Sequence, residues 1–214
     1  MRKYPALVFF ISLAAALIAA SPAFAIISEA EAKQTWEKVA GPTGLTELPF
    51  HVKEEKSPNA WVTNGSSVTV TTGLLKVLDN RDELYCVFAH EAGHIRLDHM
   101  TSSTTRNMGL SVAAGLLGYL IGSDLGNAAV NVGANLASKG WSREQEIEAD
   151  DYAVELAEAQ GVDPVGMYAA ISRLAKINKT GPSGFNSHPP DDRRLLHIKN
   201  KILELKPDAV FPEI

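Results

Sequence analysis

Residues 90–94 read His-Glu-Ala-Gly-His, and this spacing of histidines suits a metal ion. At 3.6 residues per turn, helix positions four apart differ by only about 40° around the axis, so both imidazoles project from one face. Glu91 lies about 100° away, where its carboxylate can take a proton from metal-bound water. A chain with 6 histidines would contain only about 0.02 such patterns by chance. The pattern therefore predicts a catalytic zinc site, with His90 and His94 as ligands and Glu91 as the general base and acid.

A catalytic zinc ion commonly has three protein ligands, so a third ligand must come from elsewhere in the chain. His99 is the nearest histidine, but on a continuous helix it points about 140° away from His94. We interpret it as a helix-end histidine favoured by the helix dipole. A later segment offers Glu146 and Asp150 four residues apart, so one can bind the metal while the other orients a ligand histidine. Glu148 falls on another face and is predicted to be solvated.

The order of these motifs resembles that of the HtpX-like zinc metallopeptidases. This gluzincin group also contains the CAAX prenyl proteases and periplasmic proteases of the BepA and LoiP type. Further matching segments are Asn59-Ala60-Trp61, Thr72-Gly73-Leu74-Leu75, Ser142-Arg143 and Ser187-His188-Pro189-Pro190 with Arg194. The resemblance covers roughly residues 59–196. It implies one zinc ion as the cofactor, Glu146 as the third ligand, and Asp150 as the residue that orients a ligand.

The resemblance also implies that His188 and Arg194 lie over the metal. There either side chain could contact the substrate carbonyl and stabilise the developing oxyanion, which needs a donor besides zinc. His188 could instead occupy the open zinc position in a resting state. The plainer alternatives are a surface histidine in a proline-rich loop and a solvated helix arginine.

Helices must position these residues, and capping patterns mark where they start. Residues 80–83 read Asn-Arg-Asp-Glu and residues 142–145 read Ser-Arg-Glu-Gln, and both fit a capping box. The first helix should run to about residue 100, and the second should end at Gly161. Further helices are expected over residues 29–39, closed by Gly41-Pro42, from 163 onward, and over 191–205.

Strand patterns are confined to residues 48–71. Residues 48–53 have a β composition, and residues 60–63 and 67–71 flank an Asn64-Gly65 turn that is typical of a hairpin. The predicted fold class is therefore α+β, a mostly helical gluzincin-like domain with a small sheet beside the active-site helix. The strand containing Ser67, Val68, Thr69 and Val70 is expected at the sheet edge, where an extended peptide could pair with it. The alternative is an ordinary solvent-facing strand.

The N-terminal residues are predicted to be an export signal. Arg2 and Lys3 precede the uncharged stretch 6–20, and a small-x-small pattern ends at Ala25. Cleavage after Ala25 would leave residues 26–214 as a single metallopeptidase domain in the periplasm or outside the cell. The alternative is an uncleaved signal anchor in the inner membrane that faces the periplasm.

Composition excludes several classes of protein and partner. The chain is 45% hydrophobic and 21% charged, as globular proteins are, and its single cysteine, Cys86, cannot form an internal disulfide. A formal net charge of −5 without a basic block disfavours a nucleic-acid partner.

Residues 108–138 are rich in Gly and Ala, with Asp124 as their only charge. We interpret them as helices that shield the core; the alternative is a membrane-inserted hairpin, so peripheral membrane association stays open.

These observations predict a zinc metalloendopeptidase of the bacterial cell envelope. Its expected partners are polypeptides, and the resemblance suggests unfolded or misassembled envelope proteins. One alternative is a non-proteolytic or autoinhibited, chaperone-like zinc protein whose site is closed by His188. Another is a metallo-amidase that acts on peptidoglycan peptides. The sequence does not indicate an oligomeric state.

Overall fold

The structure is a computed structural model that describes residues 27–63, 67–99, 141–180, 188 and 191–213. In chain order its elements are α1 (Glu29–Thr43), β1 (Phe50–Lys53), β2 (Ala60–Thr63), β3 (Ser67–Thr71), α2 (Thr72–Val77), α3 (Arg81–Arg96), α6 (Arg143–Ala159), α7 (Val165–Thr180) and α8 (Asp192–Leu205). The predicted signal peptide, the Asn64-Gly65 turn and the insert at 108–138 lie outside the described residues.

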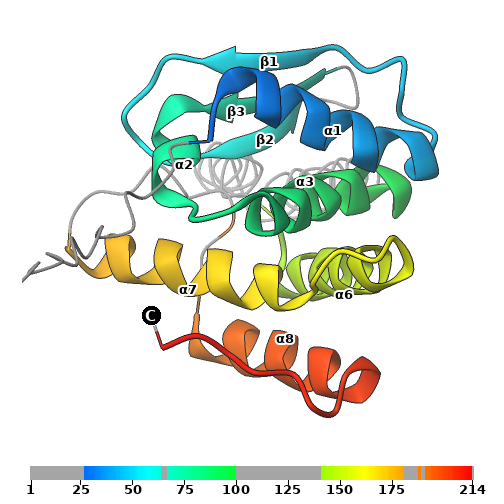
Figure 1. Cartoon of the computed structure of the whole chain (residues 1–214), viewed down its shortest axis with the longest axis vertical. Coiled ribbons are helices and arrows are strands. Elements are labelled where there is room, and N and C mark those ends of the chain that lie inside the picture. Colours follow the sequence, from blue (N-terminus) through cyan, green and yellow to red (C-terminus); the bar gives the residue numbers. More distant parts are fainter. Residues whose placement is uncertain (1–26, 64–66, 100–140, 181–187, 189–190, 214) are drawn as a thin grey trace, which may run out of the picture.

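Helix α3 lies in the middle of the described fold. The sheet and α1 pack on one side of it, and α6 and α7 pack on the other, with α8 outside them (Figure 1). Phe88 of α3 meets the rings of Trp36 and Phe50 edge-on, with centroids 5.9 and 5.6 Å apart. Buried residues of α7, such as Met167 and Ile171, belong to the same apolar core, so the helix that carries residues 90–94 is packed on both sides.

The predicted helix starts are confirmed by side-chain caps. The Asn80 side-chain oxygen accepts hydrogen bonds from the backbone N–H groups of Asp82 (3.0 Å) and Glu83 (2.9 Å) at the start of α3. At the start of α6, Ser142 and Gln145 form a reciprocal capping box. These caps are local in sequence, which is why the sequence alone indicates them.

Two predicted helix ends are wrong. Helix α1 continues through Gly41 and Pro42 to Thr43, and Gly44 caps it at a φ of 67°. Pro42 has no N–H to donate to the Lys38 carbonyl, and the helix ends one residue later, where Gly44 adopts the left-handed conformation easily. Helix α3 ends at Arg96 rather than near residue 100.

The sheet has the order β1-β3-β2 in the described part of the chain. The predicted hairpin is confirmed, because β2 pairs antiparallel with β3. The predicted edge position of Ser67, Val68, Thr69 and Val70 is wrong, because β1 pairs parallel with β3 on its other side. A parallel pairing between strands that do not follow each other leaves no turn signal in the sequence.

Close packing of α3 against α6 depends on Gly93. A Cβ atom at this position would lie 3.3 Å from the Cα of Ala149 and from two side-chain atoms of Tyr152. The absence of a side chain therefore lets the two helices approach closely. This approach brings the histidine pair of α3 next to the acidic residues of α6.

The observed architecture confirms the predicted α+β class, since most of the described elements are helices and the strands form one small mixed sheet. Among the described residues, every helix is too short or too polar to span a lipid bilayer.

Candidate metal centre

Four buried side chains converge between α3, α6 and the segment before α8. His90 and His94 come from α3, Glu146 from α6, and His188 from the segment before α8; one possible ligand atom from each lies within 4.8 Å of the others. The Nε2 atom of His90 is 3.1 Å from Nε2 of His94 and 3.2 Å from Nδ1 of His188. Glu146 Oε1 lies 2.8 Å from Nδ1 of His188 and 3.4 Å from Nε2 of His94. One metal ion could therefore contact all four side chains.

The Glu91 carboxylate at this cluster lacks an ordinary hydrogen-bond partner among the described residues. Glu91 is 0% exposed, and neither of its carboxylate oxygens makes a hydrogen bond within the described part of the chain. The nearest basic atom is Nε2 of His188, 3.3 Å from Oε1. Buried carboxylates are normally hydrogen-bonded, so the two oxygens of Glu91 suit a water or a cation as their partner. Imidazole nitrogens together with a carboxylate oxygen are the donors that zinc prefers, and the residues present therefore fit a zinc ion.

Asp150 and Arg194 hold one of the two α3 histidines. Asp150 Oδ1 is 2.8 Å from Nδ1 of His90, which turns Nε2 of that ring toward the cluster. Arg194 donates two hydrogen bonds to the Asp150 carboxylate, at 2.6 and 2.7 Å. The carboxylate is thus fixed by a bidentate contact, and the histidine is fixed by the carboxylate.

Arg194 lies at the metal cluster rather than in solvent. Its side chain is 4% exposed, so it is not a solvated helix arginine. Its guanidinium contacts Asp150, lies 2.6 Å from Glu146 Oε2, and donates to the backbone carbonyl of His188 at 3.2 Å. These contacts engage the guanidinium with Asp150 and Glu146, and a contact between Arg194 and a substrate carbonyl stays a prediction.

The surroundings of His94 contain residues that the sequence reasoning missed. The Trp141 ring stacks on the His94 ring, with centroids 4.2 Å apart and planes 13° apart. His99 Nδ1 lies 2.9 Å from His94 Nδ1, and Nε2 of His99 lies 3.0 Å from Glu148 Oε2. The prediction that His99 points away is therefore wrong, whereas Glu148 is 62% exposed, as predicted, and also pairs with His99.

An early helix end explains the error at His99. Helix α3 stops at Arg96, and Asp98 has a φ of 54° in the left-handed region. This turn redirects the chain, so the angle that a continuous helix would give does not apply. Aspartate tolerates the left-handed conformation better than most residues, so Asp98 was the available signal.

In the metal-free site, burial and neighbouring charges shift the pKa values of the carboxylates in different directions. Burial raises the pKa of Glu91, against the opposing effect of His188 and His90. Burial alone would raise the pKa of Glu146 too, but His188 and Arg194 lower it well below its usual value. The pKa of Asp150 is likewise lowered by Arg194 and His90 despite its burial. Glu91 is therefore the carboxylate best suited to take up a proton, while the other two stay ionised.

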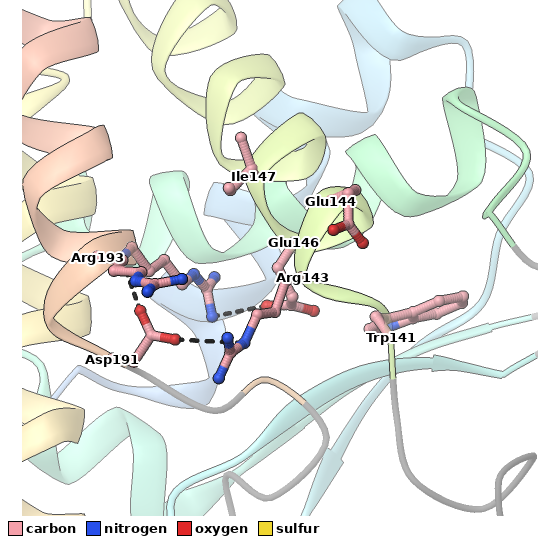
Figure 2. A pocket seen from close by; sticks show the side chains of 8 residues that line it. Trp141, Arg143, Glu144, Glu146, Ile147, Asp191 and Arg193 are labelled. Atoms are coloured by element: carbon pink, nitrogen blue, oxygen red, sulfur yellow. Dashed lines mark hydrogen bonds and ion pairs between the residues drawn. The ribbon is translucent and has the colours of Figure 1, made fainter.

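A pocket of about 310 Å³ opens beside the cluster (Figure 2). Its lining residues are Trp141, Arg143, Glu144, Glu146, Ile147, Asp191, Arg193 and Arg194. Glu146 is thus shared by the pocket and the cluster, and Trp141 contributes apolar surface. The pocket therefore meets the ligand cluster at Glu146.

Comparison with known proteins agrees with this geometry. The family model described as peptidase family M48 matches residues 27–202. The chain is 30% identical over 157 residues to "Metalloprotease LoiP" of Escherichia coli K12, covering 72% of this chain and 62% of that protein. It is 30% identical over 165 residues to "Metalloprotease YcaL" of the same strain, covering 73% and 63%. It is 25% identical over 174 residues to "Beta-barrel assembly-enhancing protease" of Yersinia pestis, covering 76% and 36%. The chain thus spans less than two thirds of the length of these relatives.

Proposed function

The chain belongs to peptidase family M48, and on that premise we propose that it is a zinc-dependent metalloendopeptidase of the bacterial cell envelope. The observation that carries the proposal is the convergence of His90, His94 and Glu146 beside the buried carboxylate of Glu91, which lacks a hydrogen bond among the described residues. One relative is named for enhancing β-barrel assembly, which supports unfolded or misassembled envelope proteins as substrates.

Glu91 and Asp150 would have different roles in the proposed hydrolysis. When bound, zinc would polarise the scissile carbonyl and lower the pKa of a coordinated water. Glu91 would accept the proton from that water and later deliver it to the leaving amine. Asp150 would keep Nε2 of His90 directed at the metal.

The sheet edge nearest to α3 offers a place for an extended peptide, and this edge is β2 rather than the predicted strand. The Thr71 N–H donates to the Asn59 carbonyl, so the alternation of an antiparallel pair turns the N–H and C=O groups of Ala60 and Val62 away from β3. A substrate strand could pair with these groups while its scissile bond lies near the α3 histidines.

The variant Val62→Pro tests this pairing. Proline removes the outward N–H but leaves the hydrogen bonds between β2 and β3 in place. Since one hydrogen bond contributes about 1 kcal/mol, we expect KM for an extended peptide to rise roughly five- to tenfold, with little change in kcat.

The matched control for this variant is Val52→Pro on the opposite edge strand. The Val68 N–H donates to the Pro49 carbonyl, so Val52 of β1 also directs its N–H away from β3. This substitution should leave KM unchanged. Equal KM values for Val62→Pro and the wild-type chain would contradict pairing at β2.

Metal removal tests the proposed reaction. We expect the purified chain to hold one zinc ion and to cleave unfolded casein. Dialysis against a chelator should abolish cleavage, and added zinc should restore it, because the ligand residues alone supply no Lewis acid. Metal analysis and gel-based cleavage assays give both readouts. Hydrolysis of muropeptides but not of casein would instead support the metallo-amidase alternative.

An autoinhibited zinc protein is the second candidate function, and one observation favours it. His188 Nδ1 lies among the other possible ligand atoms, so this side chain could occupy the open metal position in a resting state. In that case His188→Ala should cleave casein faster than the wild-type chain in the same assay. Absence of cleavage by both proteins when loaded with zinc would favour a chaperone-like role.

A further inference from the structure

We propose that His99 is a positioning residue for His94, and that Glu148 anchors His99 in turn. The inference rests on the proposed zinc site but adds residues that the site does not itself include. Three side chains form a line that starts at the metal cluster and ends at the surface: His94 and His99 are buried, whereas the Glu148 side chain is 62% exposed.

The hydrogen bonds between His94, His99 and Glu148 are compatible with only one placement of the ring protons. A metal at Nε2 of His94 requires a lone pair there, so the neutral ring must carry its proton on Nδ1. This N–H faces Nδ1 of His99 at 2.9 Å, which must then accept. His99 consequently carries its own proton on Nε2, and that N–H points to Glu148 Oε2 at 3.0 Å. Each contact thus selects the tautomer of the next ring.

The two α3 histidines are therefore supported in different ways. His90 donates directly to the Asp150 carboxylate at 2.8 Å, whereas His94 reaches a carboxylate only through His99. In both cases the acceptor fixes the ring orientation and makes Nε2 a better donor to a metal. Without His99, no comparable acceptor for Nδ1 of His94 is found in the described part of the chain.

The chain holds His99 in this place by backbone contacts as well. Its carbonyl accepts a hydrogen bond from Nε2 of Gln145 at 3.2 Å, and Gln145 Oε1 accepts from the Ser142 N–H at the start of α6. The left-handed backbone conformation of Asp98 turns the chain so that His99 lies beside His94. The same capping box that begins α6 therefore fixes the residue behind His94.

Two amide substitutions distinguish positioning from simple packing. His99→Asn places an amide oxygen near the original Nδ1 atom, so it can still accept from His94. His99→Gln extends its amide toward Glu148 instead and leaves His94 without that acceptor. Both replacements are polar and uncharged, so a role in packing alone predicts similar effects. We expect the zinc dissociation constant to rise about 10- to 100-fold in His99→Gln, and to stay within a few-fold of wild type in His99→Asn.

Glu148 has a matched control on the same helix. Glu155 is similarly exposed at 57% and pairs with Lys201, away from the metal cluster. Glu148→Ala should weaken zinc binding several-fold, while Glu155→Ala should leave it unchanged. The measurement is a zinc competition titration against a chromophoric chelator, with thermal unfolding of the zinc-free proteins to show that each variant folds.

Equal zinc affinities for His99→Asn and His99→Gln would overturn the inference, and so would wild-type affinity in both. A wild-type chain that binds no zinc would overturn the proposed function along with it. A wild-type chain that binds zinc, with the asparagine variant close to it and the glutamine variant much weaker, supports both.

Discussion

Replacing Glu91 by Gln is expected to abolish peptide hydrolysis and leave zinc bound. Gln has nearly the same shape, but it cannot accept a proton at neutral pH. Proton transfer by a positioned side chain contributes typically 10²- to 10⁴-fold to a rate, so kcat should fall by at least about that factor. The zinc content should stay at one ion per chain, because the proposed ligands are His90, His94 and Glu146.

Stability gives a second readout for the same variant. The Glu91 carboxylate is buried, and neither oxygen makes a hydrogen bond within the described part of the chain. Removing its charge should therefore not lower the thermal unfolding midpoint, even though activity is lost. Casein cleavage at more than a tenth of the wild-type rate, with normal zinc content, would contradict the assignment of Glu91 as the base.

The parts of the fold that the sequence predicts are those set by residues close together in the chain. The His90 to His94 spacing places two imidazoles on one face because a helix repeats every 3.6 residues. The caps at Asn80 and Ser142 act over three residues, and the structure confirms both. The hairpin between β2 and β3 is confirmed for the same reason.

The parts that the sequence does not predict depend on contacts between distant segments. The position of β3 inside the sheet is set by its pairing with β1, from Phe50 with Val68 to Lys53 with Thr71. No periodicity within β3 indicates this partner, although its Ser and Thr residues suggested an exposed edge. Of these residues, Thr69 and Thr71 are buried and Ser67 is half-buried.

The choice between Glu146 and Asp150 shows the same limit inside the site. Their spacing allows either one to face the metal, and only the resemblance favoured Glu146. In the structure, Glu146 Oε1 lies 3.4 Å from Nε2 of His94, on the ligand side of the ring. Asp150 lies at Nδ1 of His90, on the opposite nitrogen. The relative position of two helices decides between them, and the sequence does not contain that position in any local pattern.

Replacing Arg194 by Met is expected to lower the free energy of unfolding of the zinc-free chain by about 3–5 kcal/mol. Arg194 is buried between Asp150 and Glu146, and methionine fills similar space but removes the arginine charge from beside both carboxylates. The loss should be smaller in the zinc-loaded protein, because the metal itself would then compensate the charge of Glu146. Urea unfolding with and without zinc measures both values.

A surface arginine beside the same pocket provides the control. Arg143 has a side chain that is 74% exposed and lies 3.8 Å from Asp191. Arg143→Met should change the free energy of unfolding by less than about 0.5 kcal/mol, because exposed ion pairs contribute little. Equal losses for both variants, or an unchanged loss for Arg194→Met when zinc is added, would contradict the assignment of Arg194 as the counter-charge of two site carboxylates. A smaller loss of unfolding free energy with zinc would show that Arg194 and the metal both neutralise the Glu146 carboxylate. The stability of the contact between α6 and α8 would then depend on whether the metal centre is occupied.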